Sequence, residues 1–211
     1  MVAIRLMKII FLFCTFLYSS LSDAHWLNGE LPPFPKKIAF SLTDQHSQPF
    51  SSRQLEGRYS LVFFGYSTCT DICPTTLQIA ARVKNAVAIN EPVNVVFITL
   101  DPLHDTADKL ADYLATFDKD FIGLSGSQNE VNEAAAAFAV KYRKRRATGK
   151  TNDVIDHSGT LSLLDKSGKI MLRYPYATSA EKIIEDINYL HINGKNWLSG
   201  RMSGAAHAEA H

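Results

Sequence analysis

Two long apolar runs, each followed by a segment with helical spacing, most narrowly limit what this chain can fold into. Residues 59–65 (YSLVFFG) and 93–100 (VNVVFITL) carry apolar side chains at nearly every position. A strand with one solvated face alternates polar and apolar residues, whereas a near-continuous apolar run is typical of a strand buried on both faces. The two runs therefore predict central strands of a sheet that helices cover on both sides.

The segment after the first run predicts a helix that begins at about Cys73-Pro74, since proline is favoured in the first turn of a helix. This helix should continue to about Val87. The rest of the chain predicts strands at 38–42, 121–124, 160–164 and 169–174, helices at 105–117, 129–140 and 179–190, and an exposed loop from Lys141 to Arg146 and on to residue 152. This order indicates an α/β fold with a central mixed β-sheet flanked by helices, and its hairpin-then-helix ending resembles the thioredoxin fold.

The composition excludes several classes of protein. The 211 residues include 22 basic and 21 acidic residues, so the formal net charge is +1, without the basic excess typical of nucleic-acid-binding proteins. Hydrophobic residues make up 46%, as expected of a folded globular domain. Three cysteines are too few for a disulfide scaffold, but they are enough for one redox or metal site.

Residues 1–24 predict a secretory signal. A basic start precedes an apolar run from 9 to 18, and small residues follow, with cleavage expected after Ala24 or, alternatively, after Ser22. The run is shorter than the roughly 20 residues that span a bilayer, although an uncleaved N-terminal anchor is the alternative. Both interpretations export the remainder of the chain to the periplasm or the outer face of the inner membrane.

Three further segments follow the signal. Residues 25–37 form a proline-rich lead-in that predicts an extended arm, residues 38–190 form the folded domain, and residues 191–211 predict a flexible tail. Cys14 falls inside the signal, so the exported domain keeps only Cys69 and Cys73.

Two sequences outside the folded domain could bind copper loosely. His207 and His211 lie in the tail, where a frayed segment without a metal is the preferred interpretation. Cleavage after Ser22 would expose Asp23-Ala24-His25, and a free amine with histidine third chelates Cu(II) in a square plane. Cleavage after Ala24 would destroy that second site.

Cys69 and Cys73 lie between an expected buried strand and the helix that follows it. Ligand sites in open α/β sheets lie at the carboxyl ends of strands, and a helix N-terminus favours thiolate over thiol. Two thiolates suit Cu(I), zinc or reversible disulfide formation, and a plain structural disulfide is the alternative.

His157 lies just before the expected hairpin, a position that faces the cysteine motif in thioredoxin-like folds. Thioredoxin-type oxidoreductases place a proline there. A histidine instead completes a set of two sulfurs and one nitrogen that can hold Cu(I) or Cu(II). The alternative is an ordinary surface histidine at the start of a strand.

Three motifs in order resemble the signature of the SCO/SenC copper chaperones. They are residues 63–77 (FFGYSTCTDICPTTL), residues 96–102 (VFITLDP) followed by Asp105-Thr106, and Asp156-His157-Ser158 before an apolar strand. The resemblance covers about residues 38 to 190 and implies an exported, thioredoxin-like domain that binds one copper ion through Cys69, Cys73 and His157. It also implies a role in maturing the binuclear copper centre of cytochrome c oxidase.

The same resemblance places Asp101 near the site, where its carboxylate could steady His157 or accept a hydrogen bond at the metal. A helix N-cap is the alternative role. The chain departs from the family at Leu103-His104, where relatives often carry an acidic residue and an arginine, so a partner contact there is open. The expected partners are the copper-bearing subunit of cytochrome c oxidase or another periplasmic cuproprotein, and a chaperone that donates copper.

The cysteine pair leaves more than one function open. A copper chaperone needs His157, whereas a periplasmic thiol–disulfide reductase of copper-site cysteines needs only Cys69 and Cys73. A peroxidase is disfavoured, because Tyr66 stands where the peroxidase motif requires proline. The basic run at 141–146 is interpreted as a solvated loop, with a patch for an acidic partner as the alternative.

Overall fold

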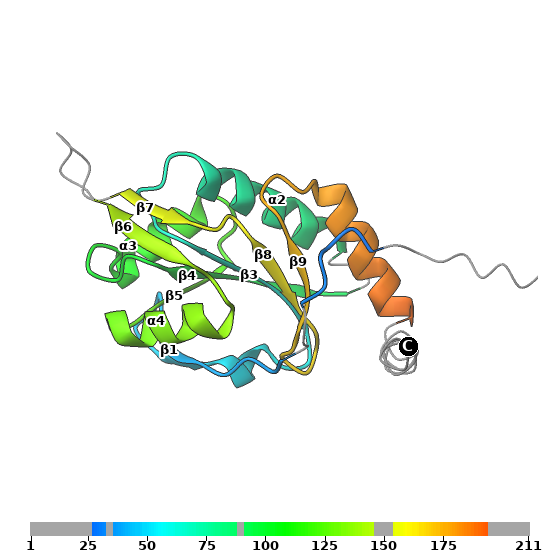
Figure 1. The fold of residues 1–211 in the computed structure, drawn as a ribbon, viewed down its shortest axis with the longest axis horizontal. Helices are drawn as coiled ribbons and strands as arrows, with labels where there is room; N and C mark the ends of the chain where they lie inside the picture. The colour runs from blue at the N-terminus through cyan, green and yellow to red at the C-terminus, as the bar shows by residue number, and fades with distance from the viewer. Residues whose placement is uncertain (1–26, 33–35, 88–90, 146–153, 194–211) are drawn as a thin grey trace, which may run out of the picture.

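The computed structural model describes residues 27–32, 36–87, 91–145 and 154–193. They form a seven-stranded sheet in the order β2-β1-β5-β4-β3-β8-β9 and a separate two-stranded ribbon, β6–β7 (Figure 1). The elements are β1 (Ser41–Asp44), β2 (Pro49–Ser51), η1 (Ser52–Leu55), β3 (Tyr59–Gly65), α2 (Ile72–Val87), β4 (Val93–Thr99), α3 (Ala107–Ala115), β5 (Ile122–Ser125), α4 (Gln128–Ala137), β6 (Tyr142–Arg145), β7 (Val154–His157), β8 (Leu161–Leu164) and β9 (Ile170–Tyr174), followed by a helical segment at 180–193.

The two apolar runs form the centre of the sheet, as predicted. β3 pairs in parallel with β4 from Tyr59 opposite Val93 to Gly65 opposite Thr99, and every residue of β3 is buried. β5 continues the parallel part beside β4, whereas β8 runs antiparallel to β3. The predicted mixed sheet of an α/β fold is therefore confirmed.

Each face of the sheet has its own hydrophobic core. Alternate residues of β3 point to opposite faces, so Phe63 joins one core and Phe64 the other. On the first face, the sheet packs against α2, α3 and the segment 180–193. On the second face, it packs against α4 and the segment around β1 and β2 (Figure 1). The central strands are covered on both sides, which explains their continuous apolar sequence.

The first strand lies later in the chain than the sequence predicts. It was expected at 38–42, but β1 continues to Asp44 and pairs with β2 through a turn. The Asp44 carboxylate accepts hydrogen bonds from the backbone N–H groups of His46 and Gln48, at 2.9 and 2.8 Å. The side chain of Asp44 therefore stabilises a turn that begins at the last residue of β1, as aspartate commonly does.

The predicted exposed loop at Lys141–Arg146 is wrong for residues 142–145, which form β6. This strand pairs antiparallel with β7 and places Tyr142 opposite His157. Half-buried side chains alternate with exposed ones along β6, which is the period of a strand, although all but one of its residues are basic. A run of basic residues is typical of a solvated loop. It shows no alternation of polar and apolar residues from which a strand could be predicted. Residues 146–153 lie outside the described part of the chain.

The described residues of the lead-in make two isolated bridges to the region of β9. Glu30 bridges to Arg173 in β9, and Lys37 bridges to Lys169 just before it. The N–H groups of Asn28 and Gly29 donate to the buried Asp186 carboxylate in the segment 180–193. Within the described residues, none of the helices has the length and apolar character that a bilayer span requires. The expected signal with Cys14, the Asp23-Ala24-His25 sequence, His207 and His211 lie outside them.

Candidate metal centre

The two cysteines follow the carboxyl end of β3. Cys69 lies in the loop after the strand, is half-buried, and donates its backbone N–H to the carbonyl of Tyr66 at 3.1 Å. Cys73 lies in the first turn of α2, one residue later than the helix start at Ile72, and is fully buried. The predicted strand–cysteine–helix arrangement is thus present. The free N–H groups of that first turn favour negative charge on the sulfurs.

Gly65 allows the sulfur of Cys73 to lie against the end of β3. A Cβ atom at Gly65 would lie 2.7 Å from Sγ of Cys73 and 2.9 Å from Cε2 of Phe97. Both distances are too short for real contacts. A larger residue at position 65 would therefore displace the sulfur or the Phe97 ring.

His157 is the last residue of β7, and two aromatic rings hold its imidazole. The ring of Phe63 lies 5.9 Å away and that of Tyr66 6.1 Å away, both in edge-to-face arrangements. Nδ1 lies 3.1 Å from the carbonyl oxygen of Ser158. Because a carbonyl can only accept, Nδ1 carries the proton in neutral His157, and Nε2 keeps its lone pair.

The free lone pair faces the cysteines. Nε2 of His157 lies 3.6 Å from Sγ of Cys73, and the donor atoms of Cys69, Cys73 and His157 all lie within 4.8 Å of one another. Cys69 and Cys73 form no disulfide in the structure. The three residues that the sequence analysis selected are therefore close enough to share one ion, and two sulfurs with an imidazole suit a soft metal such as copper.

The two thiols have opposite electrostatic properties. The pKa of Cys69 is lowered, first because the Cys73 thiol donates a hydrogen bond to its sulfur and also because the backbone N–H groups of Asp71 and Cys73 bond to it. The pKa of Cys73 is raised, because it gives that hydrogen bond to Cys69 and because it is buried. One thiolate at Cys69 and one thiol at Cys73 is therefore the favoured state without metal.

Asp101 does not have the predicted role. Its buried carboxylate accepts a hydrogen bond from Lys144 at 3.0 Å and contacts Nδ1 of His104 at 2.8 Å, rather than steadying His157. The alternative role as a helix cap is also wrong, because the N-cap of α3 is Thr106. Asp101 instead joins the loop after β4 to the β6–β7 ribbon. The prediction failed because Lys144 was expected to lie in a solvated loop.

Asp105 positions the cysteine loop, a role that the sequence analysis missed. Its side chain is 1% exposed and accepts hydrogen bonds from the N–H and hydroxyl of Ser67, at 3.0 and 2.5 Å, and from the hydroxyl of Thr99 at 2.5 Å. These bonds join the residues just before Cys69 to the end of β4. Asp105 belongs to one of the motifs already noted, but its partner Ser67 lies 38 residues away in sequence.

Comparison with known proteins points to one family. The family model described as SCO1/SenC matches residues 29–191. An SCO2-like protein of Rickettsia prowazekii is 36% identical over 168 residues, which cover 75% of this chain and 80% of that protein. The structure of Bradyrhizobium japonicum ScoI with copper bound is 30% identical, with a TM-score of 0.66 over 72% of this chain and 97% of that one.

A second solved structure has a similar level of agreement. The solution structure of apo Sco1 from Thermus thermophilus is 31% identical, with a TM-score of 0.70 over 80% of this chain and 99% of that one. The family match covers most of the chain, and it contains both cysteines and the histidine. The chain therefore belongs to the SCO1/SenC family.

Proposed function

We propose that this protein is a copper-binding chaperone that helps to assemble the binuclear copper centre of cytochrome c oxidase. The observation that carries the proposal is the convergence of Cys69, Cys73 and His157, whose donor atoms lie within 4.8 Å of one another. Membership of the SCO1/SenC family supports the same function, as does the likeness to a relative solved with copper bound.

The three side chains suit the transient binding of copper. Thiolate is a soft ligand that selects Cu(I), and the neutral imidazole of His157 adds a nitrogen that Cu(II) accepts well. The hydrogen bond from Nδ1 to Ser158 fixes the ring, so that Nε2 is the ligand atom. Cys69 and His157 are only half-buried, so a partner's ligands can approach the ion and replace them one at a time.

The cellular setting is part of the proposal. The basic and apolar start of the chain supports export by a signal at residues 1–24, or anchoring by the same segment, with the folded domain at 38–190 outside the cytoplasm. The proposed recipient is the copper-bearing oxidase subunit or another periplasmic cuproprotein, and a further chaperone would supply the copper. The helix at 180–193 includes the first three residues of the expected tail, so the proposed tail, without a role in the site, is residues 194–211.

A copper titration of the reduced and oxidised protein tests the function. The reduced protein should bind one copper ion, and the disulfide form should lose most of its affinity, because oxidation removes both thiolates. Cys69→Ser and Cys73→Ser should each weaken Cu(I) binding strongly. In the uncleaved full-length protein, Cys14→Ser is the matched control and should leave Cu(I) binding unchanged. A reduced protein that retains no copper would overturn the proposal.

The asymmetry of the two thiols favours a second candidate, a thiol–disulfide reductase of copper-site cysteines. Cys69 is half-buried with a lowered pKa, whereas Cys73 is buried with a raised pKa, which is the division between an attacking and a resolving thiol. In this reaction Cys69 would attack a partner disulfide, and Cys73 would then close the internal disulfide as the partner leaves with two thiols. His157→Ala separates the two functions, because only copper binding uses the imidazole.

A further inference from the structure

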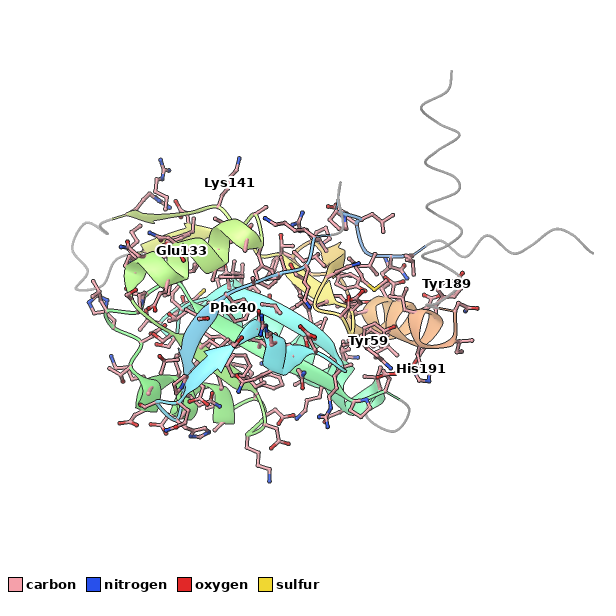
Figure 2. The ribbon with its side chains drawn as sticks, turned by 90° about the horizontal axis from the view of Figure 1, so that it is seen from below. Phe40, Tyr59, Glu133, Lys141, Tyr189 and His191 are labelled. Atoms are coloured by element: carbon pink, nitrogen blue, oxygen red, sulfur yellow. The ribbon has the colours of Figure 1, made fainter. Side chains whose placement is uncertain are left out.

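The exposed cations of the β6–β7 ribbon lie next to the metal centre. Tyr142 and Lys144 point inward, where Tyr142 contacts Asn132 and Gln128 of α4 and Lys144 bonds to Gln128 and Asp101. The alternate residues point outward: the side chain of Arg143 is 77% exposed and that of Arg145 56% exposed. Lys141 projects away from the body of the protein (Figure 2).

This positive charge is not neutralised within the ribbon. The one acidic side chain in the described part of the ribbon is Asp156, which pairs with Arg145 and lies 3.9 Å from Arg143. Lys144 is offset by Asp101. The described part of this surface therefore keeps an excess of about two positive charges, although the whole chain has a formal net charge of only +1.

Two of the cations and one proposed copper ligand line the same hollow. An open hollow in the surface is lined by Lys141, Tyr142, Arg143, Asp156 and His157, so the proposed copper ligand forms part of the same wall as two of the cations. A protein that approaches His157 to exchange copper would meet Lys141 and Arg143 at once.

Leu103 is an exposed apolar side chain on the loop that is bonded to both the ribbon and the cysteine loop. It is 77% exposed and lies in the loop after β4, between Asp101, which bonds to Lys144 of the ribbon, and Asp105, which bonds to Ser67 of the cysteine loop. Because both ends of this short loop are held, the backbone at Leu103 is fixed relative to the ribbon and the cysteine loop. An exposed apolar side chain on a rigid loop is suited to a protein contact.

We propose that Leu103 and the cations Lys141, Arg143 and Arg145 form a docking surface for an acidic partner protein that exchanges copper with Cys69, Cys73 and His157. The inference rests on the proposed function and adds the chemistry of the partner. The partner should carry an apolar pocket and surrounding carboxylates near its own copper ligands. Complementary charge would speed encounter and orient the two sites, and Leu103 would anchor the complex. Cu(I) then exchanges one set of thiolates for another without a change in oxidation state.

The rate of copper transfer from the full-length Cu(I)-loaded protein tests this surface. The acceptor is the copper-binding domain of a cytochrome c oxidase subunit, with its copper removed and its cysteines reduced. Two synthetic dithiol peptides of equal length serve as additional acceptors, one flanked by glutamates and the other by lysines. The second-order rate is measured from about 0.02 M to about 0.5 M salt, a range over which screening removes charge attraction.

Each variant has a matched control on a distant surface. Lys141→Glu/Arg143→Glu is compared with Arg53→Glu/Arg58→Glu, which makes the same change in net charge at exposed positions before the start of β3. Tyr59, the first residue of that strand, lies well apart from Lys141 (Figure 2). Leu103→Ser is compared with Ile192→Ser, because Ile192 is 78% exposed.

We expect the ribbon reversal and Leu103→Ser each to slow transfer to the oxidase domain about tenfold at low salt, and the controls to change it less than about twofold. Equal slowing by the controls, or none by the ribbon reversal, would overturn the docking surface. If the parent protein passes no copper to the oxidase domain, the proposed recipient is wrong. The rates of transfer to the two peptides then test whether the docking surface exists. The docking surface is supported if the parent transfers copper faster to the acidic peptide than to the basic one and the ribbon reversal abolishes this difference. Equal rates to both peptides would refute it.

Discussion

Nε2 of His157 lies 3.6 Å from Sγ of Cys73, although the two residues lie 84 positions apart in the sequence. The ring is already oriented by Phe63, Tyr66 and the carbonyl of Ser158, so little side-chain rearrangement is needed before an ion binds. A preoriented ligand loses less conformational freedom on binding. This relationship makes His157 the most informative residue to change.

Replacing His157 should separate Cu(II) binding from thiol chemistry. His157→Ala should weaken Cu(II) binding by about 100-fold or more, because it removes the one nitrogen from the donor set, whereas Cu(I) should lose less, since two thiolates can hold it alone. Disulfide exchange should persist, because both sulfurs remain. Parallel titrations with Cu(II) and Cu(I) and a disulfide-reduction assay measure the three effects. Unchanged Cu(II) affinity would show that His157 is not a ligand.

Cys69 should react with alkylating agents much faster than Cys73. Its pKa is lowered, so it stays a thiolate as the pH falls below the free-thiol pKa of about 8.5, whereas the raised pKa of Cys73 keeps that residue protonated. The iodoacetamide rate, followed by peptide mapping of the metal-free protein, should be nearly constant from about pH 6 to about pH 8. Cys73→Ser is the control, because a serine hydroxyl can still donate to Cys69. A rate that rises about tenfold per pH unit in this range would contradict the lowered pKa.

A methyl group at Gly65 should disturb the metal centre. Gly65→Ala places Cβ 2.7 Å from Sγ of Cys73, so the sulfur must move, and we expect copper affinity to fall about tenfold and the free energy of unfolding to fall by about 2 kcal/mol. Gly123→Ala is the matched control, because its Cβ would lie 2.6 Å from Leu114, a residue of the α3 face. The control should lose stability but keep copper affinity. Titration and denaturant unfolding of both variants decide whether the effect is specific to the site.

Asp105 should control copper affinity as well as stability. Asp105→Ala leaves the N–H and hydroxyl of Ser67 and the hydroxyl of Thr99 without their buried acceptor, which should cost about 3 kcal/mol and free the cysteine loop. Copper affinity should fall about tenfold or more. Asp186→Ala is the control, since Asp186 is equally buried but binds the N-terminal arm. If both variants lose stability and neither loses copper affinity, Asp105 has a purely structural role.

The sequence predicted the centre of the fold well, because the signals there are local. β3 begins and ends where the apolar run does, and the helix after it begins one residue from the predicted position. The placement of Cys69 and Cys73 follows from those two elements alone. His157 was selected because its position before the hairpin of β8 and β9 is also set by local pattern.

The surroundings of the three candidate ligands depend on contacts between segments that are distant in sequence. Lys144 belongs to a strand because residues 142–145 pair with β7, which begins nine positions after β6 ends. No pattern of apolar residues in β6 itself predicts that pairing. Asp101 and Asp105 stand four positions apart, yet one bonds to Lys144 and the other to Ser67.

The sequence by itself thus determined the central strands, the approximate positions of the helices and the three candidate ligands, because the periodicity of buried side chains is carried by neighbouring residues. Only the tertiary structure decided which carboxylate supports the cysteine loop and which cations border the metal centre. A hydrogen bond or an ion pair needs its two partners at the right distance in space, and chain folding sets that distance independently of their separation in sequence.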